Sequence, residues 1–231
     1  MNIVDAPSPN FDDRGRDVDM IVLHYTGMPS GAEALARLRD PQAKVSAHYL
    51  VEENGDIFHL VEESKRAWHA GVACWKGESD INARSIGIEI VNPGHEFGYR
   101  DFPVEQIDAV IALIKSIRMR YEIANAMVVG HADVAPRRKE DPGEKFPWRR
   151  LAEEGMAIAP YDGDGAAAGA ITYETALTAL QEIGYDAPVG DHAAALLAFQ
   201  RRFCPKALGQ GFDRRTKAAL VAVCKARAAV S

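Results

Sequence analysis

The residues Met20-Ile21-Val22-Leu23-His24-Tyr25-Thr26-Gly27 form a short apolar run that ends in Thr-Gly. A run of this length and composition is typical of a buried central strand. It places His24 at the carboxyl end of the strand, where open α/β sheets bind their ligands. A second apolar run, residues 126–130, leads into His131 in the same way. Because such runs alternate with helical patterns such as residues 103–121, the sequence predicts an α/β fold with a mixed central β-sheet flanked by helices.

A hairpin extends this sheet. Residues 45–51 and 56–61 are rich in β-forming side chains and flank Asn54-Gly55. Asn-Gly between two such runs is the strongest short-range signal for a β-hairpin. Residues 1–19 are polar and contain prolines, so we expect them to be a lead-in on the surface of the protein.

Residues 85–92 alternate between isoleucines on one face and Gly87, Glu89 and Val91 on the other. A carboxylate in so apolar a strand is costly unless it is paired or faces a polar cleft. We therefore interpret Glu89 as facing a cleft, with a solvated outer face as the alternative.

The loop at residues 131–143 follows the second strand and is rich in charge. Lys139 and Asp141 are two residues apart, and Asp141 precedes Pro142. A residue before proline is extended, and residues i and i+2 of an extended chain point to the same side. The two side chains should therefore face one way, either into a site or, in the alternative, from a charged surface loop.

Two imidazoles and one carboxylate, from His24, His131 and Asp141, make a ligand set typical of catalytic zinc. Imidazole ligands favour zinc over calcium or magnesium. Glu89 would then suit a general acid/base, and Lys139 would suit a cation beside a developing oxyanion. Histidines that only pack or form hydrogen bonds in the core are the alternative.

Composition limits the possible partners of the chain. Its 231 residues carry 33 acidic and 27 basic side chains, a formal net charge of −6, which argues against nucleic acid. No apolar stretch reaches the roughly 18 residues of a membrane helix, so we expect no membrane insertion. The first residues lack the pattern of a secretion signal. We therefore expect a cytoplasmic protein, and a periplasmic one if the sequence is a piece of a longer chain.

The chain is expected to contain two units. Residues 159–170 have the composition of a linker, and residues 171–228 read as three short helices. Thr172 can cap the first of these helices, which should end at Gly184. A bundle of this size is too small for a catalytic cleft but is adequate as a binding module.

Loop residues supply weaker candidates. Residues 68–82 are rich in glycine, tryptophan and polar side chains, as in loops that carry function on a rigid scaffold. Trp68, His69, Trp75 and Asn82 are our candidates for substrate contacts, with plain packing as the alternative. Of the remaining histidines, His48 and His59 are expected to be structural, and His95 and His192 to be surface residues.

Five motifs in unbroken order resemble the zinc-dependent N-acetylmuramoyl-L-alanine amidases of type 2, which share a fold with the peptidoglycan recognition proteins and phage lysozyme-type amidases. The motifs are residues 21–26, 46–51, 68–71, 82–89 and 130–143.

This resemblance implies that residues 1–158 are a catalytic domain with one zinc ion on His24, His131 and Asp141. It also implies that Glu89 is the general acid/base and Lys139 the oxyanion stabiliser. The scissile amide would join the lactyl group of N-acetylmuramic acid, or of its 1,6-anhydro form, to L-alanine of the stem peptide. Ala47 stands where phage members have a tyrosine, and Asp141 where many relatives have a cysteine.

Residues 171–228 resemble the three-helix peptidoglycan-binding domain, through Leu180-Gln181…Gly184-Tyr185, Phe199-Gln200-Arg201-Arg202 and Asp213…Thr216. The implied partners are peptidoglycan or anhydro-muropeptides, in wall recycling or remodelling. A non-catalytic peptidoglycan-binding protein and a generic zinc peptidase are the rival functions. The sequence distinguishes neither soluble from polymeric substrate nor one oligomeric state from another.

Overall fold

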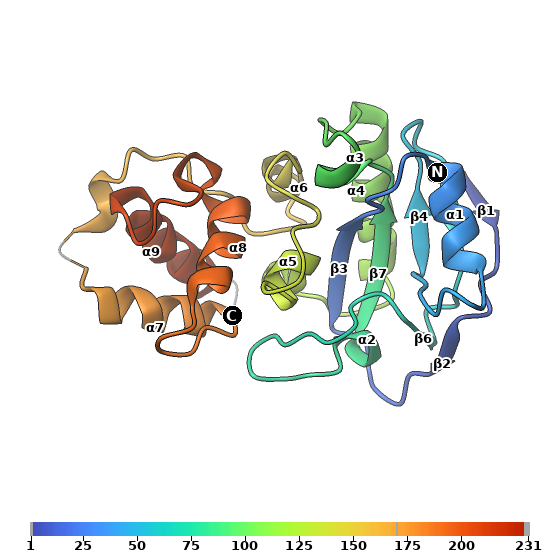
Figure 1. The fold of residues 1–231 in the computed structure, drawn as a ribbon, viewed down its shortest axis with the longest axis horizontal. Coiled ribbons are helices and arrows are strands. Elements are labelled where there is room, and N and C mark those ends of the chain that lie inside the picture. Colours follow the sequence, from blue (N-terminus) through green and yellow to red (C-terminus); the bar gives the residue numbers. More distant parts are fainter. Residues whose placement is uncertain (1, 170, 229–231) are drawn as a thin grey trace.

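A six-stranded sheet with strand order β1-β5-β4-β7-β3-β8 lies at the centre of the first unit (Figure 1). In this computed structural model, which describes residues 2–169 and 171–228, β4 and β5 pair antiparallel and the other pairs are parallel. The expected mixed sheet is confirmed. Its strands are β1 Ile3–Asp5, β3 Met20–Tyr25, β4 Tyr49–Val51, β5 Ile57–His59, β7 Ser85–Ile90 and β8 Val128–Gly130.

The hairpin is confirmed by the β4–β5 pairing, in which Val51 faces Ile57 across the turn at Asn54-Gly55. Gly55 has φ 85°, a left-handed conformation that glycine adopts without steric cost.

Two helices cover the two faces of the sheet (Figure 1). Helix α4, Val104–Arg118, packs its apolar stripe into the same cluster as Ile86, Ile88 and Ile90. Helix α1, Gly31–Arg39, packs Ala34 and Leu38 against the opposite face, with Leu50 and Val91. Because successive side chains of β7 point to opposite faces of the sheet, Gly87 and Glu89 lie on the face that α1 covers. The remaining short helices of this unit are α2 Ile81–Arg84, α3 Gly94–Phe97, η1 Asn125–Met127, α5 His131–Val134 and α6 Trp148–Glu153.

The N-terminal segment contains strands that the sequence analysis did not predict. Besides β1, strand β2 (Phe11–Asp13) pairs antiparallel with β6 (Lys65–Ala67) in a second, two-stranded sheet. Both N-terminal strands are exposed, as expected of a surface lead-in. These strands are three residues long and both N-terminal ones are exposed, so they lack the alternation of burial that marks a strand in sequence.

The second unit is a bundle of three helices: α7 Tyr173–Ile183, α8 Ala193–Phe203 and α9 Arg214–Ala228. Thr172 caps α7 by accepting a hydrogen bond from the Thr175 amide, and Gly184 follows the last helical residue with φ 128°. The expected linker holds a short 3-10 helix, η2 Ala166–Ala168, and a second one, η3 Pro205–Ala207, follows α8. Ala170, the last residue of the expected linker, lies outside the described residues, as do Met1 and residues 229–231.

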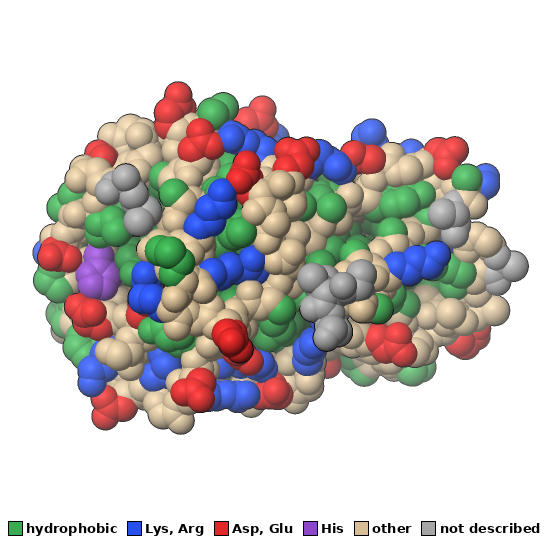
Figure 2. Space-filling model, turned by 180° about the vertical axis from the view of Figure 1, so that it is seen from behind, with side chains coloured by type: hydrophobic (Ala, Val, Ile, Leu, Met, Phe, Trp, Pro, Cys, Tyr) green, Lys and Arg blue, Asp and Glu red, His purple; other side chains and the backbone are tan. Residues whose placement is uncertain are grey.

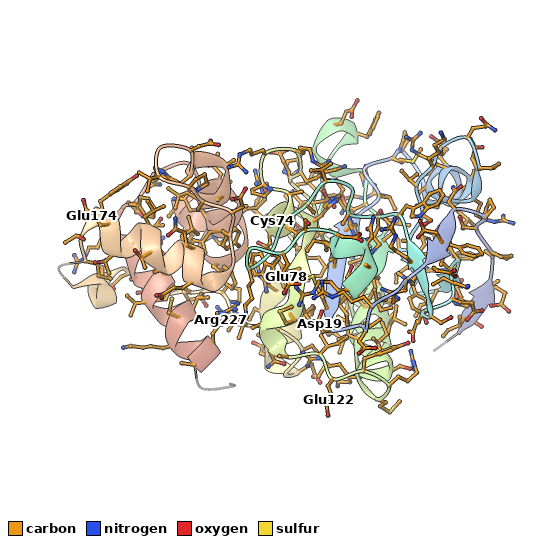
Figure 3. The ribbon with its side chains drawn as sticks, turned by 90° about the horizontal axis from the view of Figure 1, so that it is seen from below. Asp19, Cys74, Glu78, Glu122, Glu174 and Arg227 are labelled. Carbon is orange, nitrogen blue, oxygen red and sulfur yellow. The ribbon has the colours of Figure 1, made fainter. Side chains whose placement is uncertain are left out.

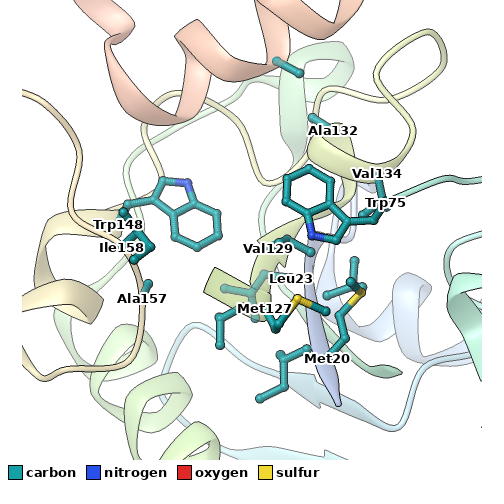
Figure 4. Close-up of a cluster of buried hydrophobic side chains, with 14 of the residues drawn as sticks. Met20, Leu23, Trp75, Met127, Val129, Ala132, Val134, Trp148, Ala157 and Ile158 are labelled. Atoms are coloured by element: carbon teal, nitrogen blue, oxygen red, sulfur yellow. The ribbon is translucent and has the colours of Figure 1, made fainter. Parts of the chain in front are cut away.

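The bundle packs directly against the α/β unit (Figure 1). Trp75 and Trp148 of the α/β unit and Phe199 of α8 belong to one continuous hydrophobic cluster. Figure 4 shows Trp75 beside Val134 and Trp148 beside Ile158, below the helix of the bundle. The two units therefore share a core.

Ion pairs anchor the loop that precedes α2. Arg84 is buried and pairs with Asp19 ahead of β3 and with Glu78 of the loop, both labelled in Figure 3.

On the face shown in Figure 2, charges of both signs are mixed rather than gathered in one basic patch. Within the described residues, no helix is long and apolar enough to cross a membrane.

Candidate active site

His24, His131 and Asp141 converge at the carboxyl edge of the sheet. His24 is near the end of β3, His131 follows β8 directly, and Asp141 lies in the loop beyond α5. The Nδ1 atoms of His24 and His131 are 2.9 Å apart. The Asp141 Oδ2 atom lies 3.1 Å from His24 Nδ1 and 3.0 Å from His131 Nδ1. All three side chains are buried, and their ligand atoms lie within 4.8 Å of one another, so they could hold a metal ion.

Electrostatics hold His24 and Asp141 in the protonation states that would bind a metal ion. Burial, reinforced by neighbouring His131, lowers the pKa of His24 to about 4, which leaves a neutral imidazole near pH 7. Burial acts to raise the pKa of Asp141, but the adjacent His131 and His24 outweigh it and hold the pKa below its usual range. A neutral imidazole and an ionised carboxylate are the forms that coordinate a cation.

Glu89 lies beside His24, because the two residues are register partners on β7 and β3. Partners in adjacent strands point to the same face of a sheet, so both side chains face the cavity. The Glu89 Oε2 atom is shielded from solvent and has no hydrogen-bond partner among the described residues. Burial, with the nearby charge of Asp141, raises the Glu89 pKa well above its usual value, while Lys139 opposes the shift. An unpaired carboxyl with a raised pKa suits proton transfer near neutral pH.

A cavity of about 440 Å³ opens over these residues. Lys139 and Asp141 both line it, as expected from their spacing before Pro142. Trp68 and His69 line it as well, so these two substrate-contact candidates lie where a ligand could reach them.

Trp75 and Asn82 are absent from the lining of this cavity. Trp75 is 1 % exposed, and its ring centroid lies 5.1 Å from that of Tyr185 in the bundle. Asn82 points its side-chain oxygen at the backbone amides of His69 and Ala70. Trp75 therefore packs against the bundle, whereas Asn82 holds the backbone at His69 and Ala70.

His95 was expected to be a surface residue, and it is exposed, but it also has partners at the edge of the cavity. It lines the cavity, with Nδ1 2.9 Å from the Tyr25 hydroxyl and Nε2 3.2 Å from Glu144. No spacing or motif in the sequence connects these residues, which meet only because α3 lies over the end of β3. His192 also has partners, since it lies against Tyr173 and Phe212 in the bundle.

Comparison with known proteins identifies the family. The profile described as "N-acetylmuramoyl-L-alanine amidase" matches residues 14–144. The chain belongs to this family of enzymes. It is 36% identical over 224 residues to the N-acetylmuramoyl-L-alanine amidase AmiD of Escherichia coli K12, covering 87% of this chain and 80% of AmiD. It is 37% identical over 165 residues to the 1,6-anhydro-N-acetylmuramyl-L-alanine amidase AmpD of the same organism, covering 63% of this chain and 88% of AmpD.

Solved structures of amidases share the architecture. The complex of Escherichia coli AmiD with the substrate anhydro-N-acetylmuramic acid-L-Ala-D-gamma-Glu-L-Lys matches with a TM-score of 0.80 at 34% identity, over 93% of this chain and 90% of that one. AmpDH3 of Pseudomonas aeruginosa in complex with anhydromuramic pentapeptide matches with a TM-score of 0.79 at 34% identity, over 94% of both chains. Matches of this extent include the helical bundle as well as the α/β unit.

Proposed function

We propose that this amidase hydrolyses the amide between N-acetylmuramic acid, in particular its 1,6-anhydro form, and L-alanine of peptidoglycan stem peptides, with one zinc ion on His24, His131 and Asp141. The observation that carries the proposal is the convergence of two imidazoles and a carboxylate beside the Glu89 carboxyl, which has no hydrogen-bond partner among the described residues. The relatives support the substrate class, since AmiD is known in complex with an anhydro-muropeptide substrate.

The donor set fits zinc in kind and in spacing. Zinc binds imidazole nitrogen and carboxylate oxygen at about 2.0–2.2 Å in tetrahedral geometry, which sets neighbouring ligand atoms about 3.3 Å apart. The separations of 2.9, 3.0 and 3.1 Å found here come within a few tenths of an ångström of that value. Bound zinc would supply Lewis acidity toward a water molecule and the scissile carbonyl.

The residues of the chain account for the proton transfers. Glu89 takes a proton from the attacking water as its oxygen bonds to the carbonyl carbon, and returns the proton to the amide nitrogen as the C–N bond breaks. The products are the lactyl carboxylic acid and the free amino group of L-alanine. The Lys139 ammonium stabilises the negative charge that develops on the carbonyl oxygen.

The proposal is tested by incubating the protein with a purified anhydro-muropeptide and measuring free stem peptide. We expect release by the zinc-loaded protein, loss of release after chelation, and recovery when zinc is added back. Zinc-loaded protein that binds the muropeptide without releasing peptide would support the rival binding-only function.

Soluble substrate and polymeric wall are separated by a parallel assay. Because AmiD and AmpDH3 are known in complexes with anhydro-muropeptides, we propose soluble fragments as the main substrate. The turnover of anhydro-muropeptide should exceed that of insoluble peptidoglycan at equal stem-peptide concentration. The opposite order would assign the enzyme to wall remodelling.

For the helical bundle we propose peptidoglycan binding, supported by the resemblance of residues 171–228 to such domains. The metal-free full chain should co-sediment with insoluble peptidoglycan even when soluble muropeptide saturates the catalytic cavity. Retention abolished by the soluble competitor would place all binding in the cavity and leave the bundle a structural role.

A further inference from the structure

We infer that a bracket formed by His69, Ala70 and Asn82 holds both metal-binding histidines in the tautomer that binds metal, so that His69 and Asn82 are positioning residues that set metal affinity. This inference rests on the zinc site of the proposed function. It goes beyond that site, because neither residue is a ligand.

The first arm of the bracket is the Ala70 carbonyl, which lies 3.0 Å from His131 Nε2. A carbonyl oxygen only accepts hydrogen bonds, so Nε2 must carry the hydrogen. In a neutral ring the other nitrogen is then bare, and the Nδ1 lone pair of His131 points into the metal cluster.

The second arm is the His69 ring, and its tautomer follows from Ser85. The Ser85 hydroxyl donates its single hydrogen to the Ile81 carbonyl oxygen, at 2.6 Å. Ser85 Oγ must therefore accept from His69 Nε2, at 3.3 Å. The bare Nδ1 of His69 in turn accepts from His24 Nε2, at 3.1 Å.

The consequence for His24 is the same as for His131, since its Nδ1 is left without a hydrogen. Two bare Nδ1 atoms and one carboxylate oxygen then face one another at about hydrogen-bond distance with no hydrogen to share. Such an arrangement is repulsive until a cation lies between the three atoms. Partners of this kind beyond the ligands orient metal-binding histidines and raise metal affinity.

Asn82 anchors the bracket to α2. Its Oδ1 accepts hydrogen bonds from the His69 amide at 3.2 Å and from the Ala70 amide at 2.7 Å. Arg138 adds a third tie, because its Nη2 donates to the same Ala70 carbonyl at 3.1 Å. The backbone that carries both arms is thus held from two sides.

Gly87 provides the room for the His69 ring. A Cβ atom at this position of β7 would lie 2.4 Å from His69 Cγ and 2.7 Å from His69 Nδ1. Real Cβ atoms do not approach so closely, so any side chain here would displace the ring. Gly87→Ala therefore perturbs the bracket without touching a ligand.

The test compares His69→Phe with His69→Asn. Phenylalanine keeps a ring but removes the acceptor, whereas asparagine returns an acceptor close to the position of Nδ1. Zinc affinity, measured by competition with a chromophoric chelator, should fall about 10–100-fold in His69→Phe and recover in part in His69→Asn. The visible absorption of the Co²⁺-loaded protein should change in His69→Phe, because it reports ligand geometry independently of activity.

Asn82 has its own matched pair. Asn82→Leu removes the acceptor for the two amides and Asn82→Asp keeps it, so zinc affinity should fall more in the leucine variant. Gly87→Ala should weaken zinc binding as well.

Each failure has a distinct meaning. If wild-type protein binds no zinc, the proposed function fails. The inference is overturned if wild type binds zinc and His69→Phe binds it with an affinity within twofold of wild type and an unchanged Co²⁺ spectrum. Should His69→Phe not fold, Ser85→Ala decides in its place, because this small truncation removes the acceptor that sets the His69 tautomer. Unchanged zinc affinity in folded Ser85→Ala would then overturn the inference.

Discussion

Arg202 of the helical bundle and Asp133 of the α/β unit form a buried ion pair, with 2.5 Å between Nη1 and Oδ2. Asp133 lies two residues after His131 and also accepts hydrogen bonds from the Gly130 amide and the Tyr185 hydroxyl. Arg202 additionally donates to the Val128 carbonyl. The bundle is thus bonded to the segment that carries His131 of the candidate metal site.

Breaking this pair should destabilise the whole chain. In Arg202→Ala the Asp133 carboxylate remains buried without its cation, which costs about 3–5 kcal/mol of unfolding free energy. Arg137→Ala is the matched control, because Arg137 also crosses between the units, to Asp186 and Asp191, but is exposed. Its loss should cost less than about 1 kcal/mol. Equal costs in urea denaturation would mean that docking does not depend on the buried pair.

Glu89→Gln should remove the proposed catalytic base while preserving the shape of the side chain. We expect kcat to fall about 10²–10⁴-fold, because glutamine cannot accept the proton from water. Zinc affinity should stay close to that of wild type, since Glu89 is not among the converging ligand atoms. Steady-state kinetics and zinc competition on the same preparation check both statements. An unchanged kcat in Glu89→Gln would contradict the role proposed for Glu89 but not the amidase activity itself.

Lys139→Ala should lower kcat more than it changes KM. Removing a positive group from the developing oxyanion costs about 10²–10³-fold in kcat. Lys145→Ala serves as control, because Lys145 donates to the Tyr99 carbonyl and does not line the cavity. A loss confined to KM would indicate that Lys139 only binds substrate.

His48 should make the metal-free protein sensitive to acid. Its Nδ1 accepts a hydrogen bond from the Gly87 amide, and burial together with the Arg14 charge lowers its pKa to about 3. Since this folded-state pKa lies below the unfolded value of about 6.5, the stabilisation is complete above that pH and is lost as the pH falls toward 3.

The neutral variant His48→Asn isolates this effect. Between about pH 6 and 4, the unfolding free energy of wild type should fall more steeply than that of the variant, by up to about 1.4 kcal/mol per pH unit. Chemical denaturation in the presence of a chelator measures both slopes. Parallel slopes would show that His48 does not titrate on unfolding.

Local patterns in the sequence were sufficient for five of the six strands of the central sheet, all but β1, and for the residues that converge on the candidate metal site. Alternation in residues 85–92 placed Glu89 on the face opposite the isoleucines, and Asn54-Gly55 marked the hairpin. His24 and His131 could be located because strand ends in α/β sheets meet at one edge. These inferences depend on the alternation of side chains along a strand and on the residues that favour turns. Both are properties of residues that are neighbours in the chain.

Contacts between distant residues could not be read in this way. Strands β1, β2 and β6 exist through pairing with segments about 50 residues away, and β1 and β2 are exposed at every residue, so no alternation of burial marks them. Trp75 and Asn82 looked like ligand contacts in a surface loop, yet the fold turns one toward the bundle and the other toward the backbone behind the histidines. Periodicity tells which face a side chain takes, whereas its partner across space depends on how the elements pack.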